Sequence, residues 1–168
     1  MEVTGATYLY TVAVIGITFI GFSAIVMMLR QTSGEPSRPL DILVAHIYME
    51  FGLIISVGSL LPSLLAFWKL SPQLVWQISS ALVGLPLLVI SVIYPARRRK
   101  AASETLPWYT KQNIATIILI SVVFLTNASG IIQDRAPAVF LTAMTVFMAF
   151  ALASWLRALN IIFLKELR

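Results

Sequence analysis

Five apolar stretches, each long enough to cross the hydrocarbon core of a membrane, set the first limit on what this chain can fold into. They cover approximately residues 8–29, 43–68, 74–94, 114–132 and 138–164. A span needs about 20 residues, because a helix rises about 1.5 Å per residue and the core is about 30 Å thick. Of the structures that can span lipid, helices fit stretches of this length. The sequence therefore predicts an all-α integral membrane bundle of five transmembrane helices, forming a single membrane domain over residues 1–168.

The composition agrees with lipid as the solvent and excludes several kinds of chemistry. Hydrophobic residues make up 59% of the chain, charged residues only 11%, and the mean hydropathy is +0.91, values outside the range of soluble domains. There is no cysteine, and His46 is the single histidine. A Ser-His-Asp set, an HExxH motif and a glycine-rich phosphate loop are all missing from the sequence. We therefore expect no enzyme activity, no metal site and no cofactor.

Basic residues predict the orientation of the bundle. Ten of the twelve lysines and arginines fall on one side of the predicted spans, and only Lys69 and Arg135 fall on the other. The ten are Arg30, Arg38, Arg97, Arg98, Arg99, Lys100, Lys111, Arg157, Lys165 and Arg168. Since positive residues accumulate on the cytoplasmic side, we expect the N-terminus outside and the C-terminus in the cytoplasm. The first segment lacks a basic region and a cleavage site, so we expect it to be retained as a helix.

The net charge of +5 does not indicate nucleic-acid binding. The positive residues cluster beside apolar segments and do not form a basic face with interleaved aromatic residues. We expect no nucleic-acid partner. The lipid bilayer itself is the expected partner.

Short connections predict how neighbouring helices run. The links 69–73 and 133–137 are too short for anything but antiparallel hairpins of the second with the third helix, and of the fourth with the fifth. Ser71 followed by Pro72 is typical of a helix start, and Asp41 is expected to cap the second span.

Glu50 is the strongest candidate for a functional intramembrane charge, because a carboxylate in lipid requires a partner, a proton or water. Arg157 is the expected partner. Glu50 is separated from Trp68 by nearly the same length of chain as Arg157 from Ala138, which places both at nearly equal depth. The alternatives are that both residues merely reach the surface, or that Glu50 handles protons or ions. His46, one helical turn before Glu50, could relay protons to it or simply be solvated.

Small residues predict where helices pack closely. Gly52, Ser56, Ser59 and Ser63 recur on one face of the second helix, and such faces let another backbone approach. Gly84 belongs to a similar line on the third helix, with Gln77, Ser80 and Ser91. We expect the short hairpin to bring these two faces together. In general, a small-residue face can pack within one chain or between subunits. A polar pathway lined by the hydroxyl groups is the functional alternative.

Two further features have a structural and a functional interpretation. The run Arg97, Arg98, Arg99 and Lys100 either sets the topology or binds anionic lipid headgroups. Asn127, within the fourth span, is expected to form hydrogen bonds between helices.

The N-terminal part of the chain, as far as the second predicted span, carries a resemblance to a known group of proteins. The run Gly21-Phe22-Ser23-Ala24-Ile25-Val26 precedes Leu29-Arg30, and the next helix carries Glu50 and then Leu60-Leu61-Pro62. In these features the chain resembles small bacterial multi-pass integral membrane proteins that have no established activity. The resemblance implies a bacterial cytoplasmic (inner) membrane as the location.

Two functions follow as hypotheses. The first is an accessory, assembly or sensory membrane protein that acts through helix contacts, with a membrane-protein partner or a second copy of itself. The alternative is a small proton or ion channel or transporter that uses Glu50 and His46.

Overall fold

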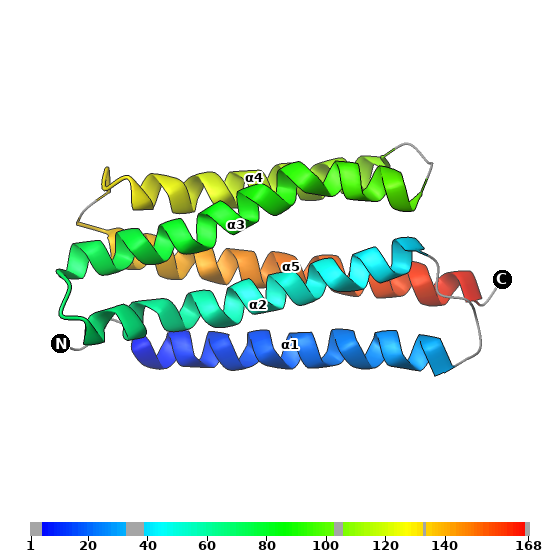
Figure 1. Cartoon of the computed structure of the whole chain (residues 1–168), viewed down its shortest axis with the longest axis horizontal. Helices are drawn as coiled ribbons and strands as arrows, with labels where there is room; N and C mark the ends of the chain where they lie inside the picture. Colours follow the sequence, from blue (N-terminus) through cyan, green and yellow to red (C-terminus); the bar gives the residue numbers. More distant parts are fainter. Residues whose placement is uncertain (1–4, 33–38, 103–105, 133, 167–168) are drawn as a thin grey trace.

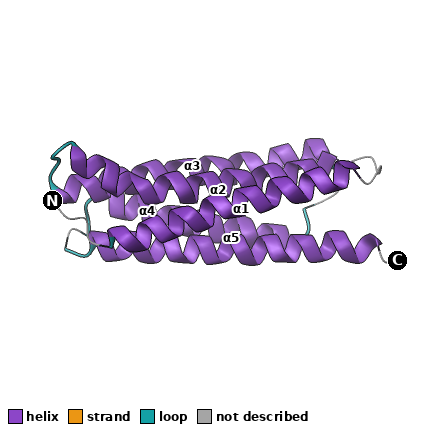
Figure 2. Ribbon diagram, turned by 90° about the horizontal axis from the view of Figure 1, so that it is seen from below, coloured by secondary structure: helices purple, strands orange, loops and turns teal. Residues whose placement is uncertain are grey.

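The computed structural model describes residues 5–32, 39–102, 106–132 and 134–166, and the regular structure in these ranges is entirely α-helical (Figure 2). The helices are α1 (Ala6–Thr32), α2 (Pro39–Phe67), α3 (Pro72–Ala101), α4 (Trp108–Ala128) and α5 (Ala136–Glu166). Each of these five described helices is long and apolar enough to span a membrane. The predicted all-helical class and the predicted number of helices long and apolar enough to span are confirmed.

The helices run in alternating directions along one common axis, so the structure is an elongated up-and-down bundle (Figure 1). α1 packs chiefly against α2, and α3 packs chiefly against α4. α2 also contacts α3, as the short hairpin predicts, while α5 contacts each of the other four helices. The bundle is therefore two helix pairs that share α5 as a common neighbour.

The alternating directions separate the charges of the two ends. The end that we call the basic end carries, among the described side chains, those of Arg97, Arg98, Arg99 and Lys100 on α3, Lys111 on α4 and Arg157 on α5. The opposite end, here called the turn end, contains the α2–α3 and α4–α5 connections with Lys69 and Arg135. The asymmetry of the sequence is thus an asymmetry of the folded bundle.

Several helix boundaries differ from the predicted ones, most of all at the basic end. α3 continues past residue 94, through Pro95 and the four basic residues, to Ala101, and α4 begins at Trp108 instead of residue 114. The predicted limits followed hydropathy, which does not decide where helical hydrogen bonding ends. At the end of α3, arginine and lysine are good helix formers and are favoured in the last turn by the helix dipole. Both helices therefore extend beyond their apolar parts.

Of the two predicted helix-start signals, the one at Ser71 and Pro72 is confirmed. Ser71 caps α3, because its hydroxyl accepts a hydrogen bond from the Leu74 N–H at 3.4 Å, and Pro72 is the first helical residue. Asp41 is not the N-cap residue of α2, since that helix begins at Pro39 and includes Asp41 in its first turn. A carboxylate there still complements the positive end of the helix dipole.

Aromatic rings fill the centre of the bundle in two groups. Phe51 packs edge-on against Phe147, with ring centroids 5.5 Å apart, and the same stacking continues through Tyr48 and Phe19 to Trp155. Nearer the turn end, Phe140 packs against both Trp76 and Phe124. Phe124, Phe140 and Phe147 are fully buried. Edge-to-face contacts of this kind favour one fixed packing of the rings.

α1 and α2 approach each other most closely at two glycines. A Cβ atom on Gly16 would lie 3.0 Å from the carbonyl oxygen of Gly52, and one on Gly52 would lie 2.5 Å from Cγ1 of Ile20. The two backbones are therefore in direct contact at this level. Gly21 lies on the outer face of α1, and apart from its two chain neighbours and the nearby backbone of its own helix, no described atom lies within 4 Å of its Cβ position.

These surroundings predict opposite outcomes for the same substitution at two sites on α1. Gly16→Ala should lower the free energy of unfolding in detergent by about 1–3 kcal/mol, because the added methyl group overpacks the crossing. Gly21→Ala is the matched control and should leave stability unchanged or raise it by up to about 1 kcal/mol, since alanine is the better helix former. Thermal or denaturant unfolding of both purified variants provides the measurement. Equal losses for the two variants would contradict a close crossing at Gly16.

Candidate functional site

Glu50 forms an ion pair with Arg97, and this pair joins α2 to α3 near the basic end. Nη1 of Arg97 donates a hydrogen bond to Oε1 of Glu50 at 3.0 Å. The side chains of Arg97 and Glu50 are 44% and 35% exposed, respectively. The second carboxylate oxygen, Oε2, is buried and has no hydrogen-bond partner among the described residues. The pair therefore satisfies one oxygen of the carboxylate and leaves the other without a donor.

Helix geometry explains why these two residues meet although their backbones lie at different heights. The stretch of α3 from its start at Pro72 to Arg97 is longer than the stretch of α2 from Glu50 to its end at Phe67. At about 1.5 Å per residue, Arg97 lies about 12 Å farther from the turn end. Side chains lean toward the N-terminus of their own helix. In this antiparallel pair the two side chains consequently lean toward each other and close the gap.

The expected pairing of Glu50 with Arg157 is corrected by this geometry. Arg157 is exposed on α5, and it lies near the hydroxyl of Tyr48. The prediction compared backbone depth alone and did not consider the reach of an arginine from another turn. Arg97 takes the role that was expected of Arg157.

His46 is exposed on α2, one turn nearer the basic end than Glu50. Among the described residues, the hydrogen bond of the Glu50 carboxylate goes to Arg97 and not to His46. A proton relay between His46 and Glu50 stays a prediction.

The basic run of α3 divides into different environments, because successive helical residues point about 100° apart. Arg97 pairs with Glu50, whereas Arg99 and Lys100 are exposed. Arg98 is buried, with only 6% of its surface exposed. Its Nη1 donates to the hydroxyls of Thr110 at 3.2 Å and Tyr94 at 3.4 Å. In the sequence the four residues form one cluster. In the fold, Arg97 contacts α2, Arg98 contacts α4, and Arg99 and Lys100 lie on the surface.

Asn127 lies at the turn end and holds three helices together. It is buried, and its amide nitrogen donates to Oγ of Ser80 on α3 at 2.9 Å and to the carbonyl oxygen of Ala136, the first residue of α5, at 3.1 Å. Its amide oxygen is buried without a partner among the described residues. These are hydrogen bonds between helices, of the kind that the sequence analysis expects for Asn127.

The small-residue faces of α2 and α3 do not meet at Gly52, Ser56 or Gly84. Gly52 faces α1, and so does Ser56, whose hydroxyl oxygen lies 2.5 Å from the position that a Cβ atom on Gly16 would take. Gly84 faces Phe124 and Leu125 of α4. At these residues each helix therefore contacts the helix outside the hairpin, because a hairpin fixes which helices are neighbours but not their rotation. Ser59 and Ser63 are buried, and their hydroxyls have no partner among the described residues.

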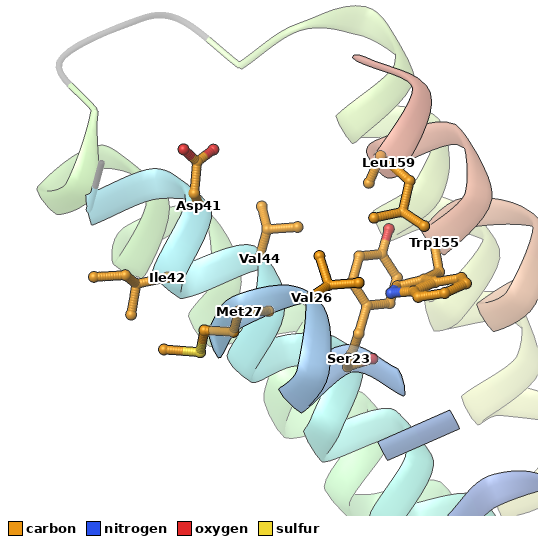
Figure 3. Close-up of a pocket in the computed structure, with 11 residues that line it drawn as sticks. Ser23, Val26, Met27, Asp41, Ile42, Val44, Trp155 and Leu159 are labelled. Carbon is orange, nitrogen blue, oxygen red and sulfur yellow. The ribbon is translucent and has the colours of Figure 1, made fainter. Parts of the chain in front are cut away.

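A half-open pocket lies between α1, α2 and α5 near the basic end (Figure 3). Figure 3 shows the Trp155 indole beside Val26 and Ser23, with the Asp41 carboxylate pointing away from it. The Ser23 hydroxyl donates to the Phe19 carbonyl oxygen at 2.9 Å, so it is already satisfied. The lining is mostly apolar. No periodicity in the sequence predicts this pocket, because three separate helices form it.

Comparison of the chain with protein-family models, with curated proteins and with solved structures finds no match. What the chain does is therefore inferred from its own residues and their arrangement.

The ion pair predicts energetic coupling between Glu50 and Arg97. Glu50→Gln and Arg97→Gln should each lower the free energy of unfolding, and the double variant should lose less than the sum. A coupling of about 0.5–1 kcal/mol is expected for a pair of this exposure. Unfolding of the four proteins in detergent measures it.

Arg157 supplies the control cycle. Glu50→Gln combined with Arg157→Gln should be additive to within about 0.3–0.5 kcal/mol. Coupling in this second cycle, together with additivity in the first, would show that Arg157 and not Arg97 is the partner of Glu50.

Proposed function

We propose that this chain is a multi-pass protein of a bacterial cytoplasmic membrane. We propose further that it acts as an accessory, assembly or sensory protein through contacts of its helices, without catalysing a reaction. The five apolar helices support the membrane location, and the resemblance of the N-terminal part of the chain supports the bacterial one. The connections between the helices are short, so the helix surfaces and the two ends of the bundle offer the area for a partner.

The observation that carries the proposal is the filled centre of the bundle. Packed aromatic rings from α1, α2, α3, α4 and α5 occupy the interior, most of them edge to face. Large apolar side chains instead cover the outer faces, for example Val14 and Ile17 on α1 and Leu85 and Val89 on α3. In lipid, helices associate through packing of such faces and through hydrogen bonds between them.

The transport alternative would require polar groups along a route through the bundle. His46 is exposed and Glu50 is held by Arg97 on the side of α2 that contacts α3. The buried second oxygen of Glu50 favours a proton-handling role, and the buried hydroxyls of Ser59 and Ser63, which have no partner among the described residues, would favour a polar route. We therefore favour the contact function over the transport function, and one experiment tests both.

The experiment purifies the tagged chain from its native membrane in mild detergent and, in parallel, reconstitutes it into liposomes. The contact function predicts a stoichiometric partner that co-purifies and no proton or ion flux above that of empty liposomes. Flux that Glu50→Gln abolishes, while the variant still folds, would establish the transport alternative instead.

Gly21→Trp on α1 and Leu85→Trp on α3 place the same bulk on two outer faces, so loss of the partner with only one of them locates the contact.

The orientation belongs to the same proposal, with the N-terminus outside and the basic end in the cytoplasm. The separation of charge between the two ends supports it. Because the chain has no cysteine, single cysteines can be introduced at Lys100 and at Lys69 as a matched pair. An impermeant thiol reagent applied to intact cells should label the Lys69 position and spare the Lys100 position. The reverse pattern would overturn the proposed orientation.

A further inference from the structure

Arg98 is the one residue of the basic run that turns into the bundle. It is 6% exposed, and it points toward Thr110, which is itself 3% exposed in the first turn of α4. A buried guanidinium loses hydration, and that loss is large unless a counter-charge replaces it. A guanidinium at this position therefore favours a nearby anion that compensates its charge.

The described residues offer Arg98 only neutral acceptors. The hydroxyls of Thr110 and Tyr94 accept its two hydrogen bonds, and the hydroxyl of Tyr109 is also near. Three of the seven acidic residues have described side chains, and none of these pairs with it. Glu50 is bound to Arg97, Asp41 lines the pocket beside α1 and α5, and Asp134 lies at the turn end.

The first turn of α4 adds positive potential at the same place. Pro107 is the cap residue of α4, and the structure gives this helix start no side-chain cap. The Thr110 and Lys111 N–H groups bond to the Pro107 carbonyl oxygen, while the N–H groups of Trp108 and Tyr109 have no acceptor among the described residues. Free N–H groups at the start of a helix favour an anion. The buried guanidinium thus meets, at Thr110, a helix start that has no side-chain cap among the described residues.

The height of Arg98 in the bundle indicates where such an anion is found. Arg98 lies in the last turn of α3, which begins at Pro72. The helix between them is about 39 Å long, which exceeds the hydrocarbon thickness of about 30 Å. Exposed Trp108 and Lys111 lie in the same first turn of α4. Tryptophan and lysine are typical of the headgroup level. At the headgroup level, phosphate is the anion that phospholipids supply.

We propose that the basic end holds one phosphate group against the outer side of the first turn of α4, beside Arg98, with an anionic phospholipid headgroup as its source. Arginine binds phosphate through a planar fork of donors, and a charge-assisted hydrogen bond of this kind is stronger than one between neutral groups. This site does not depend on which partner the helices contact. Its failure would leave the proposed contact function standing.

The test titrates the full chain in neutral detergent micelles and measures the midpoint of thermal unfolding. Dioleoyl-phosphatidylglycerol should raise the midpoint, and dioleoyl-phosphatidylcholine should not. Arg98→Gln should weaken the response to phosphatidylglycerol at least about tenfold. Arg99→Gln removes the same charge from the exposed neighbouring position and should retain the response. Equal loss in both variants, or none in Arg98→Gln, would overturn the site.

Two milder variants keep the test decisive if Arg98→Gln fails to fold. Arg98→Lys preserves the charge but removes the planar fork, and Thr110→Val removes the hydroxyl beside it. Each should bind phosphatidylglycerol severalfold more weakly than the unchanged chain, as counted by native mass spectrometry of bound lipids. Unchanged lipid binding in both would overturn the site.

Two further arms identify the source of the anion. Inorganic phosphate at constant ionic strength, without lipid, should have little effect; a rise that Arg98→Gln abolishes would support the phosphate site and assign it to dissolved phosphate. Glu104, which precedes α4 in the sequence, is tested by Glu104→Gln. If only this variant responds to phosphatidylglycerol, the chain's own carboxylate fills the site and the proposal fails.

Discussion

The direct contact of two backbones at Gly16 and Gly52 is the interaction on which the bundle most depends. In the lipid environment that we propose, burying an apolar side chain against another helix gains little, because lipid tails are equally apolar. Close packing and hydrogen bonds between helices must then supply the stability. The glycine crossing joins α1 to α2, Asn127 joins α3 to α4 and the start of α5, and the Glu50–Arg97 pair joins α2 to α3. These contacts lie at different levels and act on different helix pairs.

Much of the fold could be predicted from the sequence because lipid imposes a strict relation between length and hydropathy. The number of helices and the antiparallel hairpins follow from apolar length and from short connections, and Ser71-Pro72 marks a helix start that the structure contains. The limits at residues 94 and 114 were wrong because hydropathy ends where the hydrocarbon would end. Hydrogen bonding of the helix does not end there, and α3 continues through its arginines to Ala101.

The candidate site was harder to predict, because it depends on helix rotation and on side-chain direction. Glu50 was singled out correctly as a residue that needs a partner, but equal backbone depth pointed to Arg157. The actual partner, Arg97, starts about 12 Å away along the axis and reaches Glu50 because the two side chains lean toward each other. The burial of Arg98 between two exposed neighbours has the same origin. A signal was present, since residues 97, 98 and 99 must face three directions, but the sequence does not say which of them faces α4.

The central place of α5 has a consequence for the order of assembly. It is the only described helix that contacts all four others, and it follows them in the chain. During synthesis, the pairs α1–α2 and α3–α4 therefore emerge before the helix that they share. Until α5 arrives, Phe51 and Phe124 lack Phe147 and Phe140, the rings against which they pack. In the membrane that we propose, the unfinished chain is thus two hairpins joined through α2 and α3, and the surface that α5 will cover is open to lipid, or to any protein that attends its insertion.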